Sequence, residues 1–237
     1  MKTSYSIYAL ILFITFSSCD QLIYKQGNGD MVMRDHDIDE FSKLSLEGNF
    51  EVFLKSGDHP VLSIEIDENL EDYIEVYTRN ETLIISSTKR IRSKDGIKIF
   101  LTYKNLNRLS SSGASSIYTE NPIRTEELKV SLSGAGMIDL ELETRNLEIQ
   151  LSGAGMITVE GETNFLDLGM SGAGSFEGGN LIVNDATVTI SGVGSAFVNV
   201  SGELNARISG IGGIEYSGNP QKVNRSVSGL GKISQAD

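Results

Sequence analysis

The sequence has no tryptophan and only three prolines, two histidines and one cysteine among 237 residues. A single thiol forms neither an intramolecular disulfide nor a cysteine-rich metal site. His36 falls in a predicted tether and His59 in a predicted turn, so we expect neither a shared metal site nor a histidine relay. The sequence therefore predicts no metal ion and no cofactor.

Basic residues are also scarce. The chain has 20 Lys and Arg against 32 Asp and Glu, a formal net charge of −12. Such an acidic chain repels phosphate backbones, which excludes nucleic acid as an expected partner. The same charge argues against docking on an anionic membrane through a basic patch. Acidity of this size mainly keeps an exported protein soluble.

Only one long apolar run is present, IYALILFITF at residues 7–16. It is too short to cross a bilayer as a helix, and it lies between a basic start and small residues, as in a secretory signal. The following Phe16-Ser17-Ser18-Cys19 resembles a bacterial lipobox, although Leu is commoner at the position of Phe16. The resemblance implies removal of residues 1–18 as a lipoprotein signal peptide and lipidation of Cys19.

Several acyl chains on Cys19 would anchor the protein stably, because one chain alone binds membranes only marginally. We therefore expect an exported protein, lipid-anchored in the bacterial envelope at the outer membrane, with either face possible. The alternative is an ordinary signal peptide followed by a chance cysteine. Residues 19–37 show no clear period, and their Gly27 and Gly29 predict a tether, part of which could pair as a first strand.

Glycine, by contrast, is abundant, at 25 residues, and much of it lies in a repeat. The motif Ser-Gly-x-Gly recurs every 18 to 21 residues, with Ser115 replacing the last glycine of the first copy. A fixed period of this length is typical of solenoid proteins. The motif residues are Ser112, Gly113, Ser133, Gly134, Gly136, Ser152, Gly153, Gly155, Ser171, Gly172, Gly174, Ser191, Gly192, Gly194, Ser209, Gly210, Gly212, Ser228, Gly229 and Gly231.

Each repeat has an apolar pattern around its serine. Positions −5, −3 and −1 are apolar, as in Leu147, Ile149 and Leu151, which predicts a strand with one buried face. Positions +2 and +5, such as Ala154 and Ile157, are also apolar, and we interpret both as inward. Because the same residue types return in the same phase, each residue should stack on its own copy. The pattern therefore predicts an all-β fold, a single-stranded right-handed parallel β-helix with about nineteen residues per coil.

Three details follow from this stacking. The motif glycines should supply positive φ at the corners, and the motif serines should form a hydroxyl ladder along one edge. At the outward position +6, acidic and neutral residues alternate, which keeps like charges apart. That row reads Asp139, Thr158, Glu177, Phe197, Glu215 and Ser234.

Residues 38–107 lack the motif but alternate as strands do, whereas residues 108–237 carry the regular repeats. We interpret residues 38–107 as irregular opening coils, which cover the first edge of one β-helix spanning residues 38–237. A separate small β domain is the alternative. Arg225 breaks the inward apolar pattern of the last coil, which should blunt the other end.

The chain resembles the putative auto-transporter adhesin, head GIN domain family, a bacterial envelope domain of unknown function. The resemblance covers about residues 26–235 and implies a parallel β-helix. It supplies no catalytic residues. It is carried by Gly27-x-Gly29, Phe41-x-x-Leu44, Gly48, Lys55-Ser56-Gly57 and the Ser-Gly-Ala-Gly series.

No motif predicts catalysis. Gly-x-Gly is never followed by Gly-Lys-Ser/Thr and a helix, so a nucleotide site is not expected. A calcium-binding β-roll needs Asp after its glycines in successive copies, and only Asp139 fits. Acids such as Glu141 and Glu143 alternate with apolar residues, as on a solvated face, whereas glycan hydrolysis needs paired carboxylates. The motif serines have no histidine partner in the repeats.

The sequence thus predicts a lipid-anchored binding, adhesion or structural module without catalytic residues. An extended glycan or another envelope protein is the expected partner, and the oligomeric state stays open. The alternatives are a glycan-acting enzyme on a β-helix scaffold and an envelope signalling accessory protein. An exposed aromatic ladder would favour glycan binding, with Tyr118, Phe197 and Tyr216 as candidates.

Overall fold

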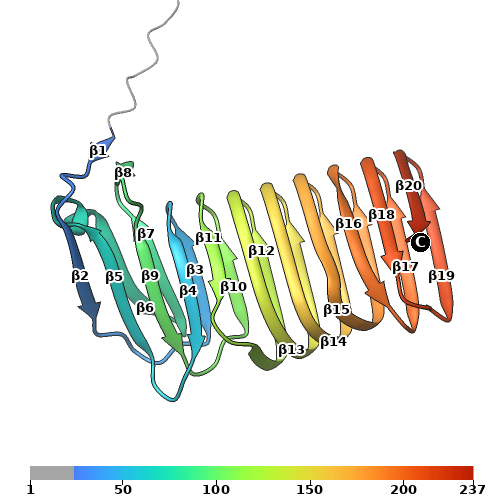
Figure 1. Cartoon of the computed structure of the whole chain (residues 1–237), viewed down its shortest axis with the longest axis horizontal. Coiled ribbons are helices and arrows are strands. Elements are labelled where there is room, and N and C mark those ends of the chain that lie inside the picture. The colour runs from blue at the N-terminus through green and yellow to red at the C-terminus, as the bar shows by residue number, and fades with distance from the viewer. Residues whose placement is uncertain (1–23, 237) are drawn as a thin grey trace, which may run out of the picture.

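The computed structural model describes residues 24–236, so the predicted signal peptide and Cys19 lie outside the described residues. The described part consists almost entirely of strands, with one short 3₁₀ helix, η1 (Glu68–Tyr73). Eighteen strands form one continuous sheet that winds along the long axis of the molecule (Figure 1). Within residues 24–236, no helix is long and apolar enough to cross a membrane.

The repeats form a parallel β-solenoid, as predicted. Stacked strands pair in the register of the motif, with Ala135 beside Ala154 and Ile138 beside Ile157. The strands are β10 (Arg108–Ser111), β11 (Ser116–Thr119), β12 (Ile123–Leu132), β13 (Ala135–Leu151), β14 (Ala154–Met170), β15 (Ala173–Ile190), β16 (Val193–Val200), β17 (Glu203–Ile208), β18 (Ile211–Ser217), β19 (Lys222–Val227) and β20 (Leu230–Gln235).

Each coil has two sides, which we call the entry face, formed by residues before each Ser-Gly corner, and the exit face, formed by residues after it. Inward side chains of both faces meet in the middle, such as Ile138 and Leu140 of the exit face and Ile149 and Leu151 of the entry face. These side chains belong to a single hydrophobic core. Burying each of them contributes about 1.5–3 kcal/mol relative to exposure, so the core column is the main source of stability.

Close stacking explains the corner glycines. Among the motif glycines only Gly212 has a positive φ in the left-handed range, 150°, so the expected positive φ is wrong for the others. Instead, a Cβ on Gly153 would lie 1.8 Å from the carbonyl oxygen of Gly134 in the preceding coil. Neighbouring strands are ~4.8 Å apart, which leaves no room there for a side chain. The glycines are needed for close approach between coils.

The motif serines line the same edge, which we call the corner edge. Their hydroxyls reach backward to the preceding coil: Ser133 donates to the carbonyl oxygen of Ser111, and Ser191 to that of Met170, both at 3.4 Å. At Ser112, Ser133 and Ser191, the row of hydroxyls along this edge therefore joins successive coils through serine-to-backbone hydrogen bonds.

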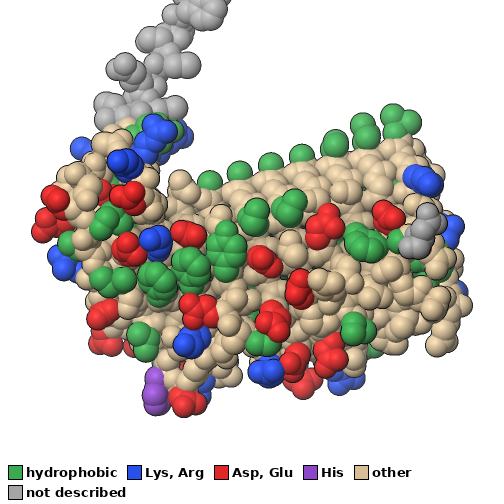
Figure 2. All heavy atoms as spheres, viewed as in Figure 1, with side chains coloured by type: hydrophobic (Ala, Val, Ile, Leu, Met, Phe, Trp, Pro, Cys, Tyr) green, Lys and Arg blue, Asp and Glu red, His purple; other side chains and the backbone are tan. Residues whose placement is uncertain are grey.

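The residue at +2 points outward, contrary to our prediction. Val193, Ile211 and Leu230 are 55%, 52% and 74% exposed, and the alanines at this position in earlier coils are exposed too. In a strand, residues separated by three lie on opposite sides, so the buried residue at +5 places +2 outside. Figure 2 shows the resulting row of hydrophobic side chains along the upper edge.

The opposite edge, which we call the threonine edge, turns the chain with side-chain hydroxyls. Thr125, Thr144 and Thr163 stack in register. The Thr144 hydroxyl donates to the carbonyl oxygen of Asn146 at 3.3 Å, and that of Thr163 donates to Phe165 at 3.2 Å. Such local hydroxyl bonds stabilise turns without glycine.

The N-terminal end does not follow chain order. β3 (Lys43–Glu47) lies between β7 (Thr82–Ser87) and β10, and β4 (Glu51–Ser56) lies between β9 (Lys98–Tyr103) and β11. The coil formed by β7 and β9 therefore lies outside the one formed by β3 and β4, although it comes later in the sequence. These parallel coils fall within residues 38–107, the stretch predicted as opening coils.

Three antiparallel strands cover that end. β5 (Val61–Asp67) pairs with β9, β2 (Met31–His36) pairs with β5, and β6 (Ile74–Arg79) pairs with β7. The parallel arrangement predicted for the whole β-helix thus stops here. A sheet edge left open invites pairing with other chains, and antiparallel strands cover it with local connections.

Part of the stretch predicted as a tether, residues 19–37, pairs with the body from Lys25 onward, as the first-strand possibility allowed. β1 (Lys25–Gln26) pairs with β8 (Ile91–Arg92), and β2 belongs to the cap. Between them, Gly29 donates its N–H to the buried carboxylate of Asp67 at 2.7 Å, and a Cβ on Gly27 would lie 2.2 Å from that carboxylate. These glycines bring a loop close to the body.

At the C-terminal end, Arg225 covers the core. Its guanidinium carbon lies 5.3 Å from the ring centre of the buried Tyr216, and it also donates to the Tyr216 hydroxyl. The charged side chain predicted to blunt the last coil therefore lies across the end of the column. In the described residues, β19 and β20 have no further strand beyond them.

Candidate functional site

The described residues contain no group of three or more His, Cys, Asp or Glu side chains that could hold a metal ion. We therefore searched the outer faces, where stacked coils bring the same sequence position into rows along the solenoid axis. Two rows carry aromatic side chains, one on each face.

On the exit face, three rings form an aromatic column from β9, β4 and β11. The ring centres of Phe53 and Phe100 lie 5.3 Å apart, and those of Phe53 and Tyr118 lie 5.7 Å apart, with nearly parallel planes. Of the predicted candidates, Tyr118 belongs to this column, whereas Tyr216 is buried. Because stacked rings cover one another, the column presents mainly ring edges.

The predicted outward row at +6 continues this column. Tyr118 lies beside Asp139, and the row then runs as predicted through Glu177 and Phe197 to Glu215. The unequal repeat lengths on either side of Phe197 are absorbed later in the coils, where the register shifts between Thr158 and Gly161 and again between Gly178 and Ile182. Phe53 and Phe100 were missed because the irregular opening stretch gave no register.

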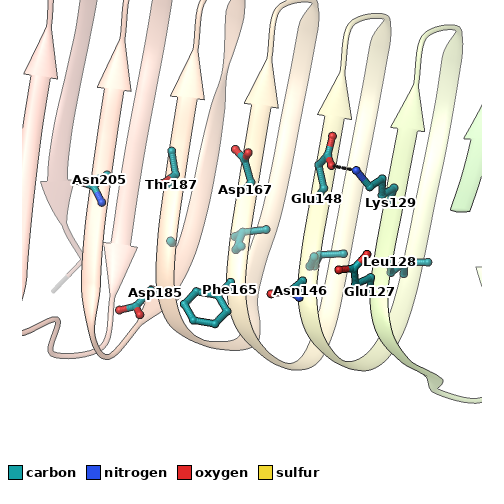
Figure 3. Close-up of a pocket in the computed structure, with 13 residues that line it drawn as sticks. Glu127, Leu128, Lys129, Asn146, Glu148, Phe165, Asp167, Asp185, Thr187 and Asn205 are labelled. Carbon is teal, nitrogen blue, oxygen red and sulfur yellow. Dashed lines mark ion pairs between the residues drawn. The ribbon is translucent and has the colours of Figure 1, made fainter. Parts of the chain in front are cut away.

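On the entry face, a shallow groove of about 350 Å³ crosses β12 to β17 beside the threonine edge. We call it the Phe165 groove, and Figure 3 shows the side chains along it. Buried Leu147 and Leu166 lie between two outward rows. The row next to the turns is Glu127, Asn146, Phe165 and Asp185, and the second row is Lys129, Glu148, Asp167, Thr187 and Asn205.

The Phe165 ring is the apolar centre of this groove. It is 46% exposed, and its neighbours along the row are Asn146 and Asp185, which are shorter and polar. In Figure 3 its ring is seen nearly face on between them. Unlike the rings of the aromatic column, it does not stack on another aromatic side chain within the described residues.

The polar groups around the ring differ in how firmly they are held. Asp185 accepts a hydrogen bond from the backbone N–H of Glu203 at 2.7 Å, and Lys129 pairs with Glu148 at 2.7 Å. Such an exposed ion pair contributes only about 0–1 kcal/mol. The side chains of Asn146 and Asp167 make no hydrogen bond to other described residues. They therefore remain available to a ligand.

The neighbouring turn is strongly polar. The Arg124 guanidinium donates two hydrogen bonds to the Glu143 carboxylate, at 2.7 and 2.9 Å. These bonds, together with the nearby positive charge, hold the pKa of Glu143 below its ordinary value. The Phe165 groove thus opens beside charged groups, and four of its own side chains are acidic: Glu127, Glu148, Asp167 and Asp185.

No sequence argument singled out Phe165. The signal was present, because Asn146 and Phe165 are 19 residues apart and Asp185 follows 20 residues after Phe165. The predictions rest on the positions around the corner and at +6, and the row after the far turn lies outside both. Reading that row would have shown one aromatic residue between two polar ones.

Related structures share the whole fold. A putative adhesin from Bacteroides fragilis NCTC 9343 is 28% identical, with a TM-score of 0.86 over 90% of this chain and 100% of that one. A putative adhesin and a putative lipid binding protein, both from Parabacteroides distasonis ATCC 8503, are 17% and 22% identical, with TM-scores of 0.74 and 0.73. They cover 90% and 91% of this chain and all of their own, and support the fold alone.

No curated protein matches the chain. The family model described as putative auto-transporter adhesin, head GIN domain, matches residues 40–220. The match contains both outer faces, all of the Phe165 groove and most of the corners. The family description and the related structures name adhesins or binding proteins and no enzyme. The chain belongs to the putative auto-transporter adhesin, head GIN domain family.

Proposed function

We propose that this protein is a lipid-anchored envelope protein that binds an extended glycan in the Phe165 groove without chemical turnover. The observation that carries this proposal is the exposed face of the Phe165 ring between Asn146 and Asp185. An aromatic face packs against the apolar face of a sugar ring, the amide of Asn both donates and accepts hydrogen bonds, and the carboxylate of Asp accepts them from the sugar hydroxyls.

The shape of the groove favours an extended ligand. Its lining comes from successive coils, β12 to β17, so equivalent positions repeat every ~4.8 Å along the axis. A chain lying along the axis would meet Asn146, Phe165 and Asp185 in turn. Convergent polar groups around an apolar centre are typical of ligand sites.

Binding without turnover fits the state of the carboxylates. Glycoside hydrolysis requires one carboxyl group as acid and a second as base or nucleophile. In the groove, Glu148 is paired with Lys129 and Asp185 is hydrogen-bonded to the backbone of Glu203. The two remaining carboxylates, Glu127 and Asp167, lie on β12 and β14, which β13 separates, and they belong to different outward rows. Names of adhesins for the family and for the 28% identical structure also support a binding role.

The envelope location rests on two independent arguments. The family description fits an extracellular or envelope-associated protein. The lipobox-like segment before Cys19 supports export and lipidation, which would anchor the solenoid at the outer membrane. Protease treatment of intact cells carrying a C-terminally tagged protein tests the face of the membrane, with Cys19→Ala as the control for anchoring. Loss of the tag from intact cells would place the groove outside.

Glycan binding is tested by arrays of bacterial and host glycans, followed by calorimetry on any hit. We expect Phe165→Ala to weaken binding at least tenfold, because the ring supplies the apolar contact. Tyr77→Ala is the matched control, since Tyr77 is 47% exposed but lies on β6 in the N-terminal cap. Equal affinities for the two variants, or no glycan hit at all, would refute this function.

A further inference from the structure

The corner edge carries no charged residue at any of its seven Ser-Gly corners, although the chain has a net charge of −12. The only side chains there larger than serine are apolar. The corners are residues 112–114, 133–135, 152–154, 171–173, 191–193, 209–211 and 228–230. A neutral edge along an acidic protein is a local departure that needs an explanation.

Apolar exposure grows along this edge. The outward residue is alanine in the first four corners and then Val193, Ile211 and Leu230, which are each more than half exposed. Met137 and Met156, two residues after their corner alanines and on the same outer side, are 41% and 40% exposed. A contiguous exposed apolar strip marks a surface that contacts a membrane or another protein.

A basic loop lies at the other end of the same edge. Residues 88–97 contain Lys89, Arg90, Arg92 and Lys94, all exposed, and β1 beside them adds Lys25. None of these side chains forms an ion pair with another described residue. Two acidic residues lie nearby: Asp95 within the loop itself, and Glu47, which stacks beside Ser112 in the neighbouring coil.

Both features lie on the side where the chain enters. Figure 1 shows β1 and β8 on the side where β18 and β20 begin, which is the corner edge. Figure 2 shows Lys and Arg gathered at that end of the corner edge. Lys25 follows Cys19 by six residues, and six extended residues span at most about 20 Å. A lipid on Cys19 would hold the basic loop within that distance of the bilayer.

The threonine edge has the opposite character. Around its turns lie Glu126, Glu127, Glu143, Glu162, Asp185 and Glu203, against Arg124, Arg145 and Lys222. An anionic bilayer attracts basic groups and repels acidic ones within about a Debye length, ~8–10 Å. The net charge of the whole chain argues against docking through a basic patch, but the basic residues gather in one loop and the acidic excess lies at the opposite edge. This distribution selects one side of the solenoid for the membrane.

We propose that the corner edge lies on a bilayer with anionic head groups. The basic loop contacts the head groups, and Val193, Ile211 and Leu230 enter the interfacial region. This inference rests on the proposed lipidation of Cys19 and adds an orientation to it. The Phe165 groove, beside the threonine edge, then opens away from the membrane toward its ligand.

The single native cysteine makes this orientation measurable, because lipidation blocks its thiol. Lipidated Leu230→Cys protein, labelled with an environment-sensitive fluorophore, is reconstituted in phosphatidylcholine vesicles containing phosphatidylglycerol and a lipid-borne nitroxide quencher. Asn164→Cys, exposed on the threonine edge, is the matched control. We expect several-fold stronger quenching of the label at 230 than at 164. Equal quenching at the two positions overturns the proposal.

A second variant tests the charges. Arg90→Glu combined with Arg92→Glu, in the Leu230→Cys background, should reduce quenching in vesicles with phosphatidylglycerol and not in pure phosphatidylcholine. Each basic residue near an anionic surface is worth about a fivefold change in partition. If quenching of the label at 230 is the same with and without the charge reversal, and with and without phosphatidylglycerol, the proposed role of the basic loop is overturned.

Labelling of the parent chain, which carries no added cysteine, separates failure of the lipid anchor from failure of the corner-edge proposal. If the parent takes the fluorophore, Cys19 is a free thiol and the proposed lipidation is wrong. The corner-edge proposal is then judged by flotation with the same vesicles. Leu230→Ser and the Arg90/Arg92 reversal should each lower the floated fraction, whereas Asn164→Ser should not. Equal flotation of all three variants and the parent overturns it.

Discussion

The two long edges of the solenoid turn the same chain with different chemistry. At the corner edge, Gly134 and Gly153 let one carbonyl lie directly against the next coil, which excludes any side chain inside the turn. At the threonine edge, the hydroxyls of Thr144 and Thr163 satisfy the turn carbonyls. The glycine turn is compact and uniform, whereas the threonine turn leaves charged and aromatic side chains free to vary outside it.

That difference separates the two proposed surfaces. The corner edge repeats one small neutral motif and presents a smooth strip, which suits contact with a membrane. The threonine edge borders the Phe165 groove, where neighbouring coils present Asn146, Phe165 and Asp185 at one position. A repeat therefore builds the scaffold, and departures from the repeat supply recognition.

The largest expected effect on the free energy of unfolding comes from a substitution at the corner edge. Gly153→Ala places a Cβ 1.8 Å from the Gly134 carbonyl oxygen, so two coils must move apart. We expect a loss of about 3 kcal/mol in the free energy of unfolding, measured by urea denaturation. Gly169→Ala is the control, because its Cβ would meet only the flexible end of Gln150. A similar loss for both variants would show that close approach at the corner is not the reason for glycine.

A smaller loss is expected at the threonine edge. Thr163→Val keeps the side-chain shape and removes the hydroxyl that reaches the carbonyl oxygens of Arg145 and Phe165. The single hydroxyl proton is shared between these two acceptors, and one hydrogen bond contributes about 1 kcal/mol, so the unfolding free energy should fall by about 1 kcal/mol. Thr187→Val, at an exposed position in the Phe165 groove, should change it little. The comparison of edges is wrong if Thr163→Val costs as much as Gly153→Ala.

The sequence predicts the regular coils well, because equivalent positions of successive repeats stack on one another and so define the register of the strands. Inward Leu147 and Ile149 and the outward row through Glu177 and Phe197 follow from periodicity alone. Periodicity does not report the corner geometry. Ala154 at +2 was therefore assigned to the wrong side, although its separation of three from buried Ile157 already contained the answer.

Two other features depend on contacts far apart in the sequence. The order of the opening coils requires knowing that β7 packs outside β3, which no local pattern encodes. The Phe165 groove requires three coils to be stacked and compared at one position. Phe53 and Phe100 meet for the same reason, since their strands, β4 and β9, become neighbours only when the opening coils stack.

The outward apolar row should matter little for stability. Ile211→Ser removes a side chain that is 52% exposed, so we expect the unfolding free energy to change by about 0.5 kcal/mol or less. Ile214→Ser, three residues later in the same strand, replaces a side chain that is 1% exposed and should cost at least about 3 kcal/mol. Urea denaturation of the pair checks the outward assignment. A large loss of unfolding free energy for Ile211→Ser would mean that the outward row at +2 stabilises the fold itself. The exposure of this row would then not indicate contact with a partner.

The smallest expected effect concerns the charged side of the threonine edge. Hydrogen bonds from Arg124 lower the pKa of Glu143, so the folded state holds this carboxylate ionised more tightly than the unfolded chain does. The contribution is present above the ordinary Glu pKa and is lost as the pH falls through the lowered folded value. NMR titration should give a Glu143 midpoint below the ordinary value, and Arg124→Gln should return it to that value. Lys129→Gln, which breaks a different ion pair on the entry face, should leave it unchanged. A Glu143 midpoint that is insensitive to Arg124→Gln would mean that this pair does not persist in solution and that the charges of this edge act only as a diffuse negative field.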